Sequence, residues 1–137
     1  MANAPSIELL SPPEMFRGQT YEHAAVVGDL VFLAGQVSRD AAGDTVAPND
    51  TAGQTVQLYA NLRRVLEFAG CAPADVVKVT TYLVDAADTQ IVLTAHQQFF
   101  GTHRPPHTLV TVHSLTRPDM RMEVDAIALR RRAEGAR

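Results

Sequence analysis

Cysteine is almost absent from this chain. The 137 residues include one cysteine, Cys71, so no disulfide can form within the chain. This composition fits the reducing environment of the cytosol. A chain of this length buries roughly two-thirds of the surface that it exposes when unfolded. We therefore expect one domain, residues 1–137, that needs neither a disulfide nor a metal ion for its stability.

Long apolar runs and targeting signals are also lacking. No window approaches the roughly 20 apolar residues that a membrane-spanning helix requires. Residues 1–5 have neither the basic region nor the apolar stretch of a signal peptide. We therefore expect a cytoplasmic protein with no membrane partner.

An excess of basic charge is missing as well. The chain has 12 Lys and Arg against 15 Asp and Glu, a formal net charge of -3. Its one run of basic residues, 130–132, lies beside the C-terminus. Proteins that bind nucleic acids usually carry a basic face or stripe, so we do not expect a nucleic-acid partner.

The motifs of several enzyme classes do not occur. His103 and His107 are four residues apart, but two prolines between them exclude the helical geometry of a metal-binding pair. The other histidines are scattered, and no metal site is predicted. No glycine-rich phosphate loop is present, and no serine has the sequence of a nucleophile elbow. Cys71, in the turn after a predicted helix, is interpreted as a free structural thiol.

Hydrophobic periodicity predicts five strands. Residues 30–34 are continuously apolar, which indicates a strand buried on both faces. Residues 22–27 are its expected hairpin partner, with Gly28 and Asp29 as the turn. Residues 76–84 alternate in polarity, as a half-buried strand does. Two further strands, 108–115 and 121–129, are expected to be joined by a turn at residues 118–119.

Helical spacing predicts two helices. The first follows a capping-box pattern at Thr51 and Gln54 and ends at Gly70. The second runs from Asp88 to Phe100. The resulting order is ββαβαββ, an α+β fold whose two helices cover one face of the sheet. Residues 1–15 are expected to form an extended arm and residues 132–137 a flexible tail.

The last predicted strand has a mixed face. Its residues 122, 124, 126 and 128 are all apolar, whereas Glu123, Asp125, Ile127 and Leu129 share the opposite face. An edge strand of mixed character fits this pattern. A subunit interface with a polar pocket at one end fits it equally well.

Several segments resemble one family in order and spacing. They are Gly28–Val37, Asn61–Leu66 with Ala69–Gly70, Asp75–Leu83 and Glu123–Ala128. Between Tyr21 and Arg131 the chain resembles the Rid/YjgF family of imine and enamine deaminases. The resemblance implies a chorismate-mutase-like fold and a homotrimer of inward-packed sheets with three clefts between subunits. It also implies imine or enamine hydrolysis with no metal and no cofactor.

The resemblance also implies the site residues. Tyr21 and Glu123 match the cleft tyrosine and the catalytic glutamate, while Ala34 and Gly35 occupy a Ser-Gly position of the family. His107 stands where the best-known deaminases have an arginine that holds the substrate carboxylate, and Leu109 occupies the cysteine-like position that follows it in the family. Arg104, three residues before His107, is a second candidate for the missing charge.

The change from arginine to histidine alters the expected substrate. Arginine carries a permanent charge in a two-pronged fork that fits a carboxylate, whereas histidine is mostly neutral near pH 7. An adjacent Glu123 would raise the pKa of His107 and restore some of that charge. Without the arginine, the 2-aminoacrylate substrate of the best-known members is not expected, and the sequence does not identify the true one.

Three functions follow from these residues. In the leading one, the chain is a hydrolase for a C=N bond of a small metabolite: Glu123 takes a proton from water and returns it to the leaving nitrogen. Backbone N–H groups near Gly35 or Leu109 would orient the substrate. The second is a non-catalytic trimer that binds or senses a small ligand. The third, a ribonuclease, is disfavoured by the acidic composition.

Overall fold

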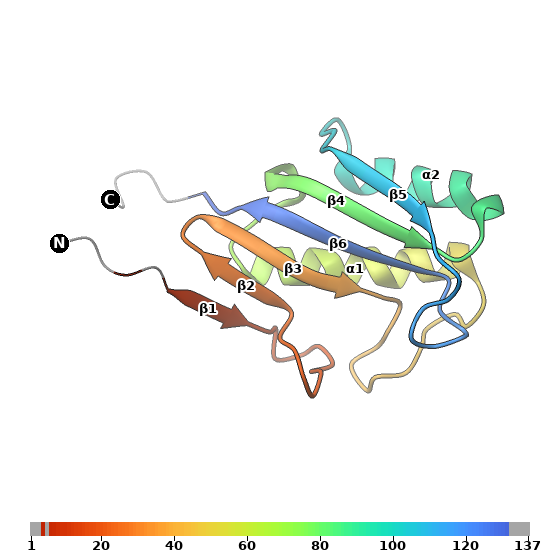
Figure 1. Cartoon of the computed structure of the whole chain (residues 1–137), viewed down its shortest axis with the longest axis horizontal. Coiled ribbons are helices and arrows are strands. Elements are labelled where there is room, and N and C mark those ends of the chain that lie inside the picture. Colours follow the sequence, from red (N-terminus) through yellow and green to blue (C-terminus); the bar gives the residue numbers. More distant parts are fainter. Residues whose placement is uncertain (1–3, 5, 132–137) are drawn as a thin grey trace.

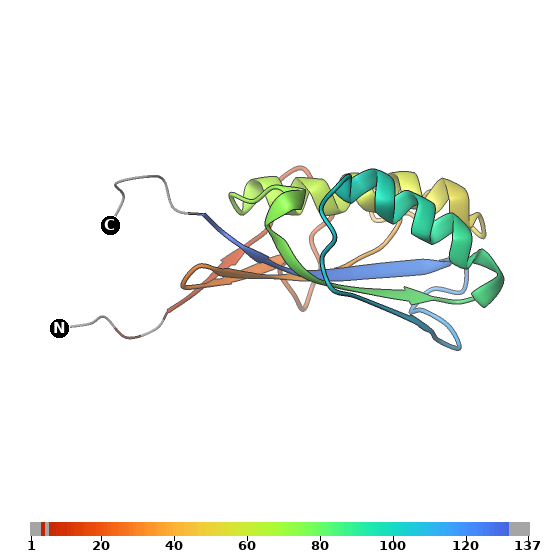
Figure 2. The ribbon, with the colours of Figure 1, turned by 90° about the horizontal axis from the view of Figure 1, so that it is seen from above.

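The protein consists of one sheet layer and one helix layer (Figures 1 and 2). The computed structural model describes residue 4 and residues 6–131. The sheet order is β1-β2-β3-β6-β4-β5. The strands are β1 Ile7–Leu10, β2 Ala24–Val27, β3 Leu30–Gln36, β4 Val76–Leu83, β5 His107–Thr111 and β6 Met122–Leu129; the helices are α1 Thr51–Phe68 and α2 Thr89–Phe100. The predicted α+β fold, with both helices on one face of the sheet, is confirmed.

The expected N-terminal arm includes a sixth strand. Ile7–Leu10 pairs with β2 as an antiparallel edge strand, although the surrounding prolines indicated only an extended segment. The strand is short and mostly exposed, so its residues carry no burial pattern that periodicity could detect. Residues 1–3 and 5 of the expected arm lie outside the described residues. The predicted tail, 132–137, lies outside them too.

The last two predicted strands are joined by a loop that includes the expected turn at residues 118–119, but they are not neighbours in the sheet. β5 pairs in parallel with β4, and β6 lies between β3 and β4, antiparallel to both. A parallel neighbour requires a crossover connection, and α2 provides it between β4 and β5. The apolar face of β6 gains more from a central position, where neighbours on both sides extend the buried surface under the helices.

The core lies between the sheet and the helices. The even-numbered residues of β6, from Met122 to Ala128, are buried there, as the alternation predicts. They pack in one cluster with Val31, Leu33 and the apolar stripe of α1. The prediction that β3 is buried on both faces is wrong, because Leu30 and Phe32 are each 42% exposed on the face away from the helices.

The open face of the sheet is unusually apolar for a surface. Its exposed large apolar side chains are Ile7, Leu9, Val27, Leu30, Phe32, Val110 and Leu129. Figure 2 shows both helices on the other side of the sheet, so neither covers this face. Among the described helices, none has both the length and the apolar character needed to cross a membrane.

The cap of α1 differs from the predicted one. Asp50, not Thr51, is the N-cap, and its carboxylate accepts a hydrogen bond from the Gly53 N–H at 3.1 Å. Gln54 serves a different purpose, because its amide donates to the carbonyls of Ala47 and Asp119. This fully buried side chain therefore ties α1 to the loop that leads into β6. The predicted end of the helix at Gly70 is confirmed by a positive φ of 83°.

Candidate functional site

An open pocket lies where β3 ends and β6 begins. It brings together four of the predicted site residues, and its lining is Tyr21, Ala34, Gly35, Val37, Arg39, Thr116 and Glu123. The ladder between β3 and β6 is irregular between Leu33 and Gln36. Such irregularities bend a strand and redirect its side chains, and they are frequent beside active sites. The pocket therefore lies where the backbone departs from regular pairing.

Gly35 allows Glu123 to lie against the backbone. A β-carbon at position 35 would be 2.8 Å from Cδ of Glu123, which is closer than two carbon atoms can approach without displacement. Glycine is thus required by the close approach of a carboxyl side chain. The pairing of Gly35 with Glu123 fixes where the carboxyl group is presented to the pocket.

Glu123 has a raised pKa. Burial is the largest cause and the nearby Asp125 carboxylate adds to it, while the positive charge of Arg39 acts in the opposite direction. Loss of hydration disfavours the charged form of an acid, and so does a like charge nearby. A carboxyl group with a raised pKa exchanges protons more readily near neutral pH than an ordinary glutamate does.

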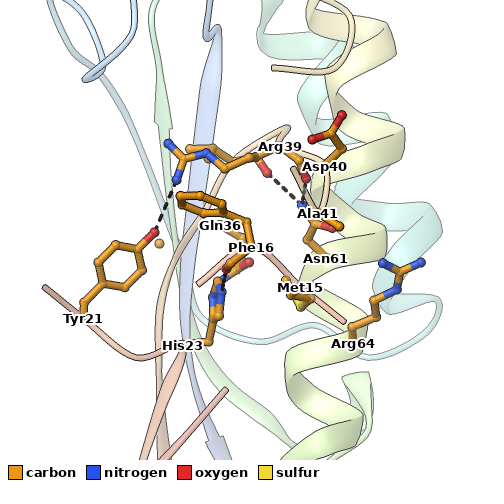
Figure 3. A pocket seen from close by; sticks show the side chains of 12 residues that line it. Met15, Phe16, Tyr21, His23, Gln36, Arg39, Asp40, Ala41, Asn61 and Arg64 are labelled. Atoms are coloured by element: carbon orange, nitrogen blue, oxygen red, sulfur yellow. Dashed lines mark hydrogen bonds between the residues drawn. The ribbon is translucent and has the colours of Figure 1, made fainter. Parts of the chain in front are cut away.

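Tyr21 forms the outer wall of the pocket. Its ring is 41% exposed and contacts the edge of the His23 ring at a centroid distance of 5.9 Å. Gly18 makes room for it, since a β-carbon at position 18 would collide with the Tyr21 ring. The Tyr21 hydroxyl faces the guanidinium of Arg39 (Figure 3), with Nη1 3.5 Å from the hydroxyl oxygen.

Arg39 is a site residue that sequence reasoning missed. Its guanidinium lies 4.7 Å from the centroid of the Phe16 ring. Its carbonyl accepts a hydrogen bond from the Asn61 amide at 2.9 Å, which fixes the start of the loop. A single arginine in a polar loop has no pattern that distinguishes it from a surface residue, so no sequence signal was available to find it.

A second, smaller cavity lies behind Tyr21 and Arg39 on the α1 side, and Figure 3 shows its lining. His23 is its central polar group. Its Nδ1 is 3.1 Å from the Gln36 amide nitrogen and its Nε2 is 2.7 Å from the Phe16 carbonyl. The Gln36 amide also donates to the Ala34 carbonyl. His23 and Gln36 therefore brace both the irregular end of β3 and the residue beneath Arg39.

The remaining predicted site residues lie elsewhere. His107 begins β5 and shares a register row with Val79 and Ala126, which face the helices. It lines a separate groove that also includes Arg104. Leu109 is half-buried and packs against the core. Within one chain, none of these three lines the Glu123 pocket.

His107 is held as a neutral group. Its ring stacks on His96 at a centroid distance of 4.1 Å, and its Nε2 is 2.8 Å from the Thr81 hydroxyl. Burial, followed by the charge of Lys78, lowers the pKa of His107. Burial and the adjacent His107 lower the pKa of His96 to about 4. Within one chain Glu123 is not among the groups that shift the pKa of His107, so the rise expected from an adjacent Glu123 does not occur there.

The other candidates from the sequence contribute no chemistry to this pocket. Cys71 is buried and unpaired, and burial raises the pKa of its thiol, as befits the structural thiol expected. Within the described part of the chain, no three His, Cys, Asp or Glu side chains gather in a way that could hold a metal ion.

Comparisons with known proteins agree on one family. The model of a family described as Endoribonuclease L-PSP matches residues 15–130. A RutC family protein of Pyrococcus abyssi is 35% identical over 79% of this chain and 84% of its own length. A 2-iminobutanoate/2-iminopropanoate deaminase of Salmonella typhimurium is 32% identical over 81% of this chain and 88% of its own.

A solved structure supports the same assignment. The crystal structure of a putative endoribonuclease from Thermotoga maritima superposes with a TM-score of 0.84 at 30% identity, covering 90% of this chain and 98% of the other. The sequence motifs, the sheet order and these matches agree. The chain therefore belongs to the Endoribonuclease L-PSP family, the Rid/YjgF family that its motifs resemble.

Proposed function

We propose that the chain is a hydrolase that removes nitrogen from the C=N bond of a small imine or enamine without a cofactor. The observation that carries this proposal is Glu123, a half-buried carboxyl group with a raised pKa, held against Gly35 in an open pocket. The name of the Salmonella relative, an iminobutanoate deaminase, supports the same reaction class.

Glu123 would serve both proton transfers. As a water oxygen bonds to the imine carbon, the π electrons move to nitrogen; Glu123 accepts the water proton and delivers it to that nitrogen. Glu123 then accepts the hydroxyl proton of the resulting carbinolamine and delivers it to the amine nitrogen. The C–N bond breaks, and ammonia and a ketone leave. An enamine would first need protonation at carbon to become the imine. One acid–base group suffices because it is restored after each transfer.

The functional pocket is proposed to lie between subunits of a homotrimer. The pocket is open to one side, and the exposed apolar side chains of the sheet lie on the same face as Glu123. Arg104, His107 and Leu109 lie away from this pocket in their own chain. Packing of the open faces would allow the β5 edge of a neighbouring subunit to close the pocket, and so unite the two groups of predicted residues.

Ammonia release tests the proposed reaction. Small imines generated in situ, 2-iminobutanoate among them, are incubated with wild type and with Glu123→Gln, and ketone and ammonia are measured. Glu123→Gln is expected to lose about 10²- to 10⁴-fold in rate. Glu67→Gln, an exposed glutamate of α1, is the matched control and should keep full activity.

The same assay separates the alternatives. If wild type binds the ketone product but accelerates the hydrolysis of none of the imines, the chain is a ligand-binding protein. Cleavage of a labelled RNA is measured in parallel, because the family description names an endoribonuclease. Cleavage of that RNA together with inertness towards imines would replace the proposal.

A further inference from the structure

Arg39 is a partly buried cation that interacts electrostatically with Glu123 but makes no ion pair within 4 Å in the described residues. In the described part of the chain, the ion pairs within 4 Å that involve arginine belong to Arg17, Arg121 and Arg131. The Nε of Arg39 is shielded from solvent and has no hydrogen-bond acceptor. Polar groups with so little solvent normally find partners in a folded protein. The outer guanidinium nitrogens of Arg39 make one hydrogen bond to the described residues, the long one to the Tyr21 hydroxyl, so they can still donate to an anion.

The guanidinium of Arg39 is fixed in position before any ligand binds. The Phe16 ring supports one face of it, and the Tyr21 hydroxyl accepts a long hydrogen bond from Nη1. Phe16 is itself fixed, because its carbonyl contacts the ring of His23 and its own ring fills the space beside Gly43. A cation that is already oriented loses little conformational entropy when it binds.

The direction of the side chain matters as much as its charge. In Figure 3 the Arg39 guanidinium points towards the Tyr21 hydroxyl and away from Asn61 and Arg64. Arg39 and Tyr21 both line the Glu123 pocket. A ligand in this pocket would therefore contact a guanidinium and a phenol at one end and a carboxyl group at the other.

We propose that Arg39, together with the Tyr21 hydroxyl, binds the anionic group of the ligand in this pocket. A guanidinium forms parallel, charge-assisted hydrogen bonds with a carboxylate. Arg39 thus sets specificity, whereas Glu123 handles protons. As a statement about the substrate, the inference rests on the proposed imine hydrolysis; as a statement about binding, it can be tested without any turnover.

Other cations of the chain are less suited to this role. His107 is a neutral ring packed on His96. Lys78 donates a hydrogen bond to the Thr108 hydroxyl at 2.6 Å and does not line the pocket. Arg104 lines the groove beside α2. In a single chain, Arg39 is the arginine that lines the Glu123 pocket.

A calorimetric binding experiment tests the inference. The probes are 2-oxobutanoate, the ketone that hydrolysis of 2-iminobutanoate would release, and its uncharged methyl ester. The variants are Arg39→Gln, Arg39→Lys, Glu123→Gln and the control Arg63→Gln, whose guanidinium also lies over an aromatic ring, Phe99, at 5.0 Å. Circular dichroism and light scattering confirm that each variant keeps its fold and assembly.

The acid should bind wild type more tightly than the ester does. Arg39→Gln should weaken binding of the acid by about tenfold or more, because a charged hydrogen-bond partner is lost, and should leave the ester unchanged. Arg39→Lys, which keeps the charge, should fall between the two, and Arg63→Gln should match wild type. Should Arg39→Gln fail to fold, an acid affinity in Arg39→Lys equal to that of wild type would overturn the inference.

Two results would overturn the inference. One is equal affinity of wild type for acid and ester, and the other is unchanged acid binding in Arg39→Gln. Loss in Arg104→Gln instead would move the anion site to the neighbouring groove. Glu123→Gln keeps the two proposals apart: it should retain acid binding but lose turnover. Arg39-dependent binding with no hydrolysis by wild type would refute the proposed reaction alone.

Discussion

At the scale of single residues, the site depends on the absence of a side chain at Gly35. Gly35 has no side chain, and the carboxyl group of Glu123 occupies the space that a β-carbon would take. The cation of the same pocket, Arg39, lies over an aromatic ring and acts electrostatically on Glu123 without forming an ion pair within 4 Å. The pocket thus combines a proton-exchanging acid and a positive charge, each held by its immediate neighbours.

Gly35→Ala should displace the carboxyl group of Glu123 while leaving the protein folded. The added methyl group would lie 2.8 Å from Cδ of Glu123, so the side chain must move. Misplacement of a catalytic group by about 1 Å can reduce the rate about 10²-fold. We expect a loss of that order in imine hydrolysis, with an unchanged circular dichroism spectrum. Full activity would show that the carboxyl group does not need this position.

Glu123→Gln should stabilise the fold at neutral pH. Burial raises the pKa of Glu123 in the folded chain above its unfolded value, so the folded state binds the proton more tightly. Its contribution is therefore favourable below the unfolded pKa and is lost as pH rises through the folded pKa. The Gln variant should melt at a higher temperature than wild type at pH 7, and this difference should shrink at pH 4. A lower melting temperature at pH 7 would contradict the prediction.

The sequence predicted one half of this pocket, whereas the other predicted residues lie elsewhere in the same chain. The last strand's alternation placed Glu123 on the open face, and the family resemblance added Tyr21, Ala34 and Gly35, which the structure brings together. His107 was assigned to the same site, but its ring lies under α2. Alternation along β5 could have shown this only if the neighbours of β5 had been known. Arg39 is a site residue because of its contacts with Phe16 and Tyr21, which are distant in sequence, so no local sequence pattern identifies it.

At the scale of elements, strand existence was easier to predict than strand pairing. The alternation of β6 identified its buried face correctly, because that pattern is local. The neighbours of β6 depend on how the whole sheet covers the two helices, and the predicted turn at Pro118–Asp119 does not make β5 and β6 adjacent. Asp119 instead accepts a hydrogen bond from Gln54 of α1. The loop is therefore shaped by a helix far away in sequence.

Gln54→Leu should weaken the fold through this loop. The substitution removes the Gln54 bonds to the carbonyls of Ala47 and Asp119, each of which keeps a backbone N–H donor, and leaves the Arg121 N–H without its acceptor. A buried group left unsatisfied costs about 1–3 kcal/mol. We therefore expect a loss of about 1–3 kcal/mol in the free energy of unfolding, measured with urea at fixed protein concentration. Gln98→Leu, on the exposed side of α2, should change it by less than about 0.5 kcal/mol.

At the scale of the whole molecule, the open face of the sheet sets the expected assembly. Apolar side chains of this size, gathered on one face, typically mark a contact surface. Both acids of β6 lie beside them, so the proposed contact would place the Glu123 pocket at its border. A single chain has one wall of the pocket; the assembly would supply the other.

Phe32→Glu should break the proposed trimer. Phe32 is 42% exposed near the middle of the open face, paired with Ala25 and Ile127, and a charge there would lose hydration on contact. Light scattering should report three times the chain mass of 14.9 kDa for wild type and a single chain for the variant. Val56→Glu, at a 74% exposed position of α1, should remain trimeric. A monomeric wild type at micromolar concentration would refute the assembly.

The separation of the predicted site residues into two pockets of one chain has a genetic consequence. If each working cleft borrows one wall from a neighbour, a chain damaged at Glu123 and a chain damaged at His107, on the borrowed wall, would each be inactive only when alone. Unfolded together and refolded as hybrids, they would rebuild some clefts from the two undamaged walls. Mixed defects would then complement one another and recover a fraction of wild-type turnover, whereas a site contained in a single chain would give none.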